Sequence, residues 1–167
     1  MNKIKYIILL IFTFLVNGCS IYNFSGAGKI NAKTFQVNNF QNNSPLIEPG
    51  IERIFTQRLQ NLIQNQTNLN LTTSNGELVY EGEITSYRLD ANAPASGDIA
   101  SQTRLTIVIN VRFANKNKEK DNFEKTFSFY DDFPGNTVPT SSQISKSLEI
   151  IYQRICQDIF NESLAKW

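Results

Sequence analysis

Apolar and polar side chains alternate along most of residues 102–115. Every odd-numbered position from Leu105 to Phe113 is apolar, and the even-numbered positions from Arg104 to Arg112 are polar except for Val108. Because successive side chains of a β-strand point to opposite faces, this period of two predicts a long strand with one buried face. Such a strand favours a sheet that has one covered face and one open face.

A second strand returns antiparallel to the first. The charged segment 116–121 supplies a hairpin tip, and residues 122–130 then place Phe123, Phe127 and Phe129 on one face. If the apolar faces of the two strands coincide, three cross-strand pairs follow: Phe113 with Phe123, Ile109 with Phe127, and Arg112 with Glu124. This register gives Arg112 an ion-pair partner and leaves Arg88 and Arg104 without one.

Two other segments have the period of a helix. Apolar residues repeat at steps of three and four over 51–65 and again from 144 to about 164. The hydroxyls of Thr140, Ser141 and Ser142 can cap the start of the second helix.

Three shorter segments predict further strands, at 34–40, 69–73 and 78–89. The apolar face of the third changes from even to odd positions, which predicts a β-bulge near Thr85 or Ser86. Residues 74–76 (Ser-Asn-Gly) are typical of a hairpin turn between the second and third of these strands.

The order strand, helix, four strands, helix predicts an α+β fold. We expect a two-layer sandwich in which two helices pack on one face of a four- to five-stranded, mainly antiparallel sheet. The first strand leaves through a helical crossover, so it can pair parallel to a neighbour.

The first 18 residues have the layout of a secretory signal that is cleaved. A cationic start at 1–5 precedes eleven uncharged residues at 6–16, a run shorter than the roughly 20 apolar residues that cross a bilayer. The segment Leu15–Ser20 (LVNGCS) resembles a bacterial lipobox. Cys19 is therefore expected to be acylated and to become the mature N-terminus, and the uncharged Ser20 favours delivery to the outer membrane.

This interpretation divides the chain into a signal peptide at 1–18, a lipidated tether at 19–33 and one α+β domain at 34–167. The alternative is an ordinary secreted protein in which Cys19 has no role. The remaining cysteine, Cys156, lies in the helical pattern near the C-terminus, where a small buried residue is the simplest interpretation.

The composition argues against an enzyme. The chain has no histidine, the commonest general base, and its two distant cysteines cannot form a four-thiolate metal site. The 16 basic and 15 acidic residues nearly balance, which excludes the basic footprint of a general nucleic-acid binder. Two carboxylate pairs, Glu81 with Glu83 and Asp131 with Asp132, are better explained by a solvated strand face and a turn than by acid–base catalysis. No catalytic residue, metal site or cofactor is expected.

Lys125 shares a strand face with Phe123 and Phe127, which is unusual for a cation. An inward-pointing lysine often protects an edge strand from pairing with other chains. The alternative is that the sheet is partly open to an amphiphile and that Lys125 meets an anionic headgroup.

Several stretches resemble the LptE family, the lipopolysaccharide-assembly lipoproteins of the outer membrane. They are Cys19–Gly26 after the lipobox, Tyr80–Ile84, Arg104–Ile107, Val111–Lys116, Phe123–Phe127 and Asp158–Asn161. The resemblance covers essentially the whole mature chain and implies two helices on a four- or five-stranded sheet.

The resemblance also implies a role without catalysis. A member of this family plugs the LptD β-barrel, helps the barrel to assemble and assists insertion of lipopolysaccharide into the outer leaflet. We expect phosphorylated lipid A to be met by cations, and the candidates are Arg104, Arg112, Lys116 and Lys125. The main alternative is a structural or assembly lipoprotein of another periplasm-facing envelope complex.

Overall fold

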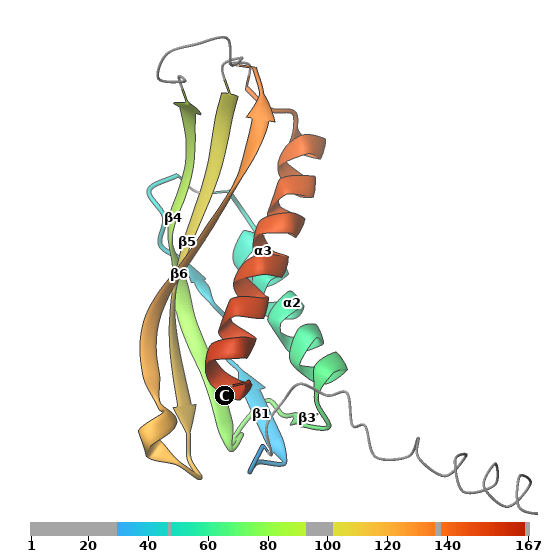
Figure 1. The fold of residues 1–167 in the computed structure, drawn as a ribbon, viewed down its shortest axis with the longest axis vertical. Helices are drawn as coiled ribbons and strands as arrows, with labels where there is room; N and C mark the ends of the chain where they lie inside the picture. Colours follow the sequence, from blue (N-terminus) through green and yellow to red (C-terminus); the bar gives the residue numbers. More distant parts are fainter. Residues whose placement is uncertain (1–29, 47, 93–101, 136–137, 166–167) are drawn as a thin grey trace, which may run out of the picture.

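The computed structural model describes residues 30–46, 48–92, 102–135 and 138–165. The expected signal peptide, Cys19 and most of the tether lie outside these residues. The elements are β1 (Thr34–Val37), β2 (Gln41–Asn42), α2 (Ile51–Gln66), β3 (Asn70–Leu71), β4 (Leu78–Asn92), β5 (Gln102–Asn115), the 3-10 turn η2 (Glu119–Asp121), β6 (Phe123–Pro134) and α3 (Ser141–Leu164). Both helices lie on one face of a mixed sheet (Figure 1), so the expected two-layer α+β architecture is confirmed.

The sheet is built around β5, which pairs antiparallel with β4 on one side and with β6 on the other. All three predicted cross-strand pairs are present, with Phe113 opposite Phe123, Ile109 opposite Phe127 and Arg112 opposite Glu124. The bulge in β4 falls between Ile84 and Ser86, as predicted. The alternation of β5 therefore set the register correctly, because a slip of one residue would turn its apolar side chains toward solvent.

The predicted hairpin at residues 74–76 is wrong. β1 lies between β3 and β4 and pairs parallel with both, so the strand order is β3-β1-β4-β5-β6. The loop after β3 crosses β1 closely: a Cβ at Gly76 would lie 2.7 Å from the Cβ of Gln36. Because the chain crosses over through α2, β1 can occupy the free edge of β4. The long-range pairing of β1 with β4 thus replaces the local pairing of β3 with β4 that the hairpin would have formed.

The strand predicted over 34–40 ends at Val37, and a second short strand, β2, begins at Gln41, just beyond the predicted range. β1 pairs with the start of β4, and β2 pairs parallel with Glu83 and Ile84 farther along β4. Between them Phe40 turns into the core, where its ring meets Phe55 of α2 edge-on at 4.9 Å.

The core lies between the sheet and the two helices. α2 buries Phe55, Leu59 and Ile63, and α3 buries a matching series from Ile151 to Ile159. Each fully buried side chain of this size contributes roughly 1.5–3 kcal/mol, so the helix–sheet contact is the main source of stability. In the described part of the chain, no helix combines the length and the apolar character needed to cross a membrane.

The start of α3 is fixed by a capping box. Of the three candidate hydroxyls, that of Thr140 accepts from the backbone N–H of Gln143, whose side chain in turn accepts from the Thr140 N–H. This reciprocal pair satisfies two of the backbone donors that a helix start leaves open.

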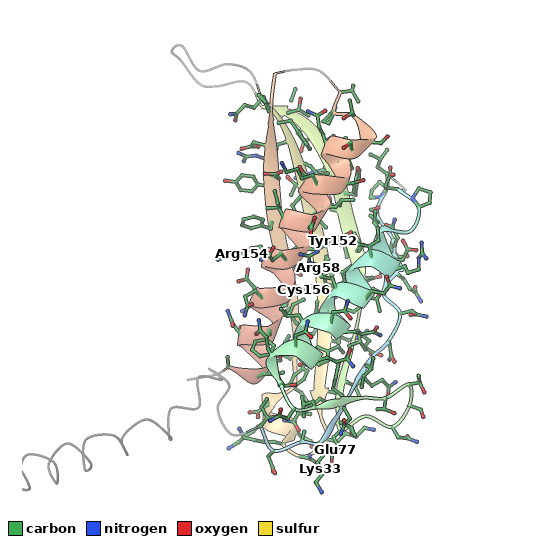
Figure 2. The ribbon with its side chains drawn as sticks, turned by 90° about the vertical axis from the view of Figure 1, so that its right-hand side faces the viewer. Lys33, Arg58, Glu77, Tyr152, Arg154 and Cys156 are labelled. Atoms are coloured by element: carbon green, nitrogen blue, oxygen red, sulfur yellow. The ribbon has the colours of Figure 1, made fainter. Side chains whose placement is uncertain are left out.

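Tyr152 lies on α3 at its contact with α2 (Figure 2), and its ring meets Phe55 edge-on at 5.2 Å. Its buried hydroxyl has no hydrogen-bond partner among the described residues. The hydroxyl of the equally buried Tyr80, in contrast, lies 2.9 Å from the hydroxyl oxygen of Ser163. Burial raises the pKa of both phenols, so both are neutral at physiological pH.

These two tyrosines give a matched prediction. Tyr152→Phe removes a buried hydroxyl without a protein partner, so we expect the free energy of unfolding to rise by about 1 kcal/mol. Tyr80→Phe breaks a buried hydrogen bond, so we expect a fall of about 1 kcal/mol. Urea unfolding of the two variants measures both changes. An equal loss of unfolding free energy in both variants would contradict the finding that the Tyr152 hydroxyl has no hydrogen-bond partner.

Candidate functional site

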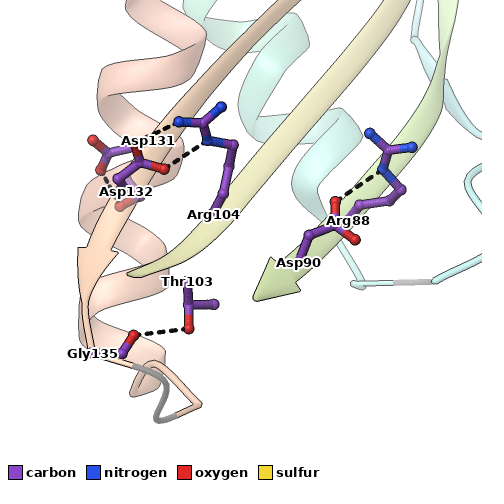
Figure 3. A network of polar contacts seen from close by, with 8 residues as sticks. Arg88, Asp90, Thr103, Arg104, Asp131, Asp132 and Gly135 are labelled. Atoms are coloured by element: carbon purple, nitrogen blue, oxygen red, sulfur yellow. Dashed lines mark hydrogen bonds and ion pairs between the residues drawn. The ribbon is translucent and has the colours of Figure 1, made fainter. Parts of the chain in front are cut away.

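The face of the sheet opposite the helices carries most of the candidate residues. At one end of this open face, Arg104 of β5 donates two hydrogen bonds to the carboxylate of Asp132 of β6 (Figure 3). Nε lies 2.7 Å from Oδ1, and Nη2 lies 2.8 Å from Oδ2. The guanidinium also lies 3.7 Å from the ring centroid of Tyr130. Arg104 was expected to have no partner, and the structure corrects this.

The missed partner follows from the register that was predicted. The pairing of Phe113 with Phe123 also places Arg104 opposite Asp132, but the sequence analysis ended this strand at Tyr130. The strand continues to Pro134, because Leu105 and Arg104 still have strand partners in Asp131 and Asp132. The Asp131–Asp132 pair therefore lies in β6, and the predicted turn at this point is wrong.

This ion pair predicts a pH dependence of stability. The hydrogen bonds from Arg104 lower the pKa of Asp132 below its ordinary value of 3.8. A lowered folded-state pKa means that the pair contributes fully at neutral pH and that its contribution is lost as the pH falls through the folded pKa, below about 4. We expect Asp132→Asn to lower the melting temperature at pH 7 and the difference from wild type to shrink toward pH 3.

Asp90→Asn is the control, because the Asp90–Arg88 pair is 3.4 Å long and more than half exposed. Such pairs contribute little to stability, so the control is expected to melt within a few degrees of wild type. A difference between Asp132→Asn and wild type that does not change with pH would contradict the proposed contribution of the Arg104–Asp132 pair.

At the other end of the open face, Arg112 pairs with Glu81 of β4, with 3.1 Å between Nε and Oε1. Glu124, which stands opposite Arg112 as predicted, instead accepts a hydrogen bond from Asn110 at 2.8 Å. The register was therefore right and the ion-pair partner wrong, because β4 offers a second carboxylate at the same level. A shallow hollow of about 540 Å³ lies here, lined by Val79, Glu81, Arg112, Phe113, Ala114, Asn122, Phe123 and Glu124.

The four candidate carboxylates are all engaged by neighbouring side chains. Glu81 holds Arg112 and Asn38, and Glu83 accepts from Asn43. Asp131 points to the helix side and accepts from the buried hydroxyl of Ser147 on α3, while Asp132 holds Arg104. Among the described residues, no group of His, Cys, Asp or Glu could hold a metal ion. The carboxylates thus serve the sheet and its contact with α3.

Lys125 lies on the helix side of β6, which is an edge strand of the sheet. Its Nζ lies 2.6 Å from Oε2 of Glu162 on α3 and 5.7 Å from the ring centroid of Phe127. The side chain is about half exposed, and its partner belongs to the same chain. This arrangement agrees with an edge-protecting lysine more closely than with a headgroup ligand.

Lys116 lies just beyond β5 at the hairpin tip, where its backbone N–H donates to the carbonyl of Glu77. Its side chain is exposed. The four candidate cations do not form one cluster: Arg104 and Arg112 are eight positions apart along the open face, Lys116 lies at the tip, and Lys125 faces α3.

Cys156 is buried on α3, and burial raises the pKa of its thiol to about 12. A thiol that stays protonated at neutral pH is a poor nucleophile, so the packing role expected for Cys156 fits its surroundings.

These features define the class of the protein: a two-layer α+β domain in which ion pairs join neighbouring strands on the open face of the sheet. The chain belongs to the LptE family, described as lipopolysaccharide-assembly, whose family model matches residues 32–163. The family consists of non-enzymatic outer-membrane lipoproteins that face the periplasm, and it implies an LptD partner and the involvement of lipopolysaccharide. The expectation that the protein is not an enzyme is confirmed.

Solved structures agree with the fold at low sequence identity. The hypothetical protein CT253 from Chlamydia trachomatis has a TM-score of 0.54 at 9% identity, over 81% of this chain and 99% of that one. Protein XCC0632 from Xanthomonas campestris has a TM-score of 0.54 at 8% identity, over 83% and 86%. A putative neuraminyllactose-binding hemagglutinin homolog from Helicobacter pylori has 0.51 at 11%, over 79% and 86%. A search of the curated proteins finds no match.

Proposed function

We propose that this protein is anchored to the outer membrane through acylated Cys19, plugs and helps assemble an LptD-type β-barrel, and assists the insertion of lipopolysaccharide into the outer leaflet. The observation that carries this proposal is the family match, which spans the sheet and both helices from residue 32 to 163. A plug has to fill space and present a polar surface, and it needs no reacting group. The paired charges of the open face suit that task.

The length of the N-terminal segment fits the anchor. Ten residues lie between Cys19 and Ile30, the first described residue, so an extended chain from Cys19 to Ile30 spans at most about 40 Å. An acylated Cys19 would hold the domain close to the membrane surface. Two or three acyl chains give stable anchoring, whereas one chain gives only marginal binding.

The four candidate cations differ in how free they are to meet lipid A phosphates. Arg104 and Lys125 are held by Asp132 and Glu162, so we propose that their main role is in the fold. Arg112 is more than half exposed in a single contact with Glu81, and Lys116 has no side-chain partner among the described residues. We propose Arg112 and Lys116 as the residues that contact phosphate.

Replacing Arg112 and Lys116 together by alanine is expected to weaken lipopolysaccharide binding about thirtyfold, because two exposed charged contacts of up to roughly 1 kcal/mol each sum to about 2 kcal/mol. Binding of purified protein to labelled lipopolysaccharide measures this change. Arg88→Ala with Lys146→Ala is the control, since it removes the same charge elsewhere and is expected to bind within about twofold of wild type. If lipopolysaccharide binding weakens equally in both variants, the effect comes from net charge, and the specific role of Arg112 and Lys116 is refuted.

Co-purification from detergent-solubilised outer membranes tests the function itself. A tagged full-length protein is expected to bring down an LptD-type barrel, identified by mass. Recovery of a secretion or peptidoglycan complex without that barrel would favour the alternative, a structural lipoprotein of another envelope complex.

A further inference from the structure

We infer that the protein meets its barrel partner through an uncharged edge formed by residues 59–76, and that the partner surface at this contact is itself polar and uncharged. This inference rests on the proposed function. The edge comprises the second half of α2, strand β3 and the loop that leads to β4. It contains 18 consecutive residues without Asp, Glu, Lys or Arg, although the chain is 19% charged and a stretch of this length would on average hold about three charges.

The fold gathers these residues along one side of the domain, where β3 and the end of α2 lie beside β1 (Figure 1). β3 pairs with β1, and the backbone N–H of Thr72 donates to the carbonyl of Phe35 at 2.9 Å. β1 is itself free of charged residues. The exposed side chains of the edge include Asn61, Gln64, Asn65, Asn68, Asn70 and Leu71.

The opposite side of the domain is built differently. β6 and α3 carry the ion pairs Lys125–Glu162 and Arg154–Asp158 there. Charges on an edge strand prevent it from pairing with other chains, and natural sheets use lysine in particular for this purpose. The β3 side lacks this protection, and its short strand leaves only two residues for backbone pairing. Contact with a partner at this side therefore depends mainly on the amide side chains of the edge.

The chemistry of the edge restricts the partner. A charged partner surface would lose its water against the edge and find no opposite charge within residues 59–76, although Lys33 and Glu77 border the edge at the end of β3; this loss costs several kcal/mol per ion. A wholly apolar surface would leave the amides of Asn61, Asn65 and Asn68 without hydrogen bonds, which is also costly. A surface rich in amide, hydroxyl and carbonyl groups satisfies these side chains, with one apolar contact for Leu71, which is 37% exposed. Depletion of charge is also typical of the central part of protein interfaces.

The test is to place charges on the edge without disturbing the fold. Asn61→Lys with Asn65→Lys adds two cations at exposed positions of α2, where lysine is at least as good a helix former as asparagine. Thr126→Lys with Ser128→Lys adds the same charge at exposed positions of β6 and is the matched control. Each tagged variant and the wild type are co-expressed with the LptD-type barrel, and the captured barrel is quantified at about 0.1 M and about 1 M salt.

We expect the wild type to retain the barrel at both salt concentrations, because an uncharged contact is not screened. We expect the α2 variant to capture at least about tenfold less barrel and the β6 variant to stay within about twofold of wild type. Equal capture by the α2 variant and wild type, equal loss in both variants, or loss of the wild-type complex in high salt would overturn the inference and leave the proposed function standing. Failure of the wild type to capture the barrel at either concentration would overturn both.

Discussion

Replacing Cys19 by alanine is expected to release the protein from the membrane or to leave it unprocessed with its signal peptide attached. Each methylene of an acyl chain contributes about 0.8 kcal/mol when it is buried in the bilayer, so losing two or three chains removes essentially all of the anchoring free energy. None of the helices among the described residues offers a second means of crossing the membrane. Fractionation of cells that express the variant, combined with metabolic acyl labelling, measures the effect.

Cys156→Ala is the matched control for this experiment, because it removes the only other cysteine of the chain. Cys156 is buried on α3, so its loss is expected to lower stability and to leave acylation and membrane attachment unchanged. Acyl label that persists in Cys19→Ala would refute the assignment of Cys19 as the anchor.

Replacing Gly82 by alanine is expected to cost at least about 3 kcal/mol of unfolding free energy, the largest effect we foresee for any single small substitution in the domain. A Cβ at this position of β4 would lie 2.0 Å from the carbonyl oxygen of Asn110 on β5 and 2.8 Å from Cε1 of Phe40. The first contact is to backbone, so it cannot be relieved by a rotamer change. The β4–β5 ladder therefore has to open locally to relieve the contact with Asn110, and Phe40 has to shift as well.

Urea unfolding followed by circular dichroism measures this loss, with Ser128→Ala as the control. Ser128 is exposed on β6, so its truncation is expected to change stability by less than about 0.5 kcal/mol. If Gly82→Ala unfolds at the same urea concentration as the control, the close approach of β4, β5 and Phe40 is not rigid.

The ion pairs of the sheet bear directly on function. Arg104 and Lys125 were candidates for lipid A binding because the family resemblance implies cations that meet phosphate, yet each is held by a carboxylate of the same chain. A cation in such a pair has to give up its partner before it can bind a phosphate, which reduces the net gain. We therefore propose Arg112 and Lys116, whose internal contacts are weaker or absent, for contact with phosphate, and the uncharged edge for contact with the barrel.

The sequence by itself determined the parts of the fold that depend on local periodicity. The alternation of residues 102–115 gave the central strand, its buried face and its register with β6, and the helical periods gave α2 and α3. The same register also contained the Arg104–Asp132 pair, which was missed only because the strand was ended four residues early. The sequence predicts these features because a shift of one residue in a strand would expose its apolar side chains to solvent and bury its polar ones.

Only the tertiary structure decided the order of the strands and the partners of the charged residues. The short segments at 34–37 and 70–71 carry too little pattern to show that β1 enters between β3 and β4, since this depends on which backbone edge is still unpaired after the long hairpin has formed. The choice of Glu81 for Arg112 and of Glu162 for Lys125 likewise depends on packing between segments more than 30 residues apart. The uncharged edge depends on both the sequence and the tertiary structure. The sequence shows that residues 59–76 lack charge, and the crossover through α2 brings these residues together on one side of the domain.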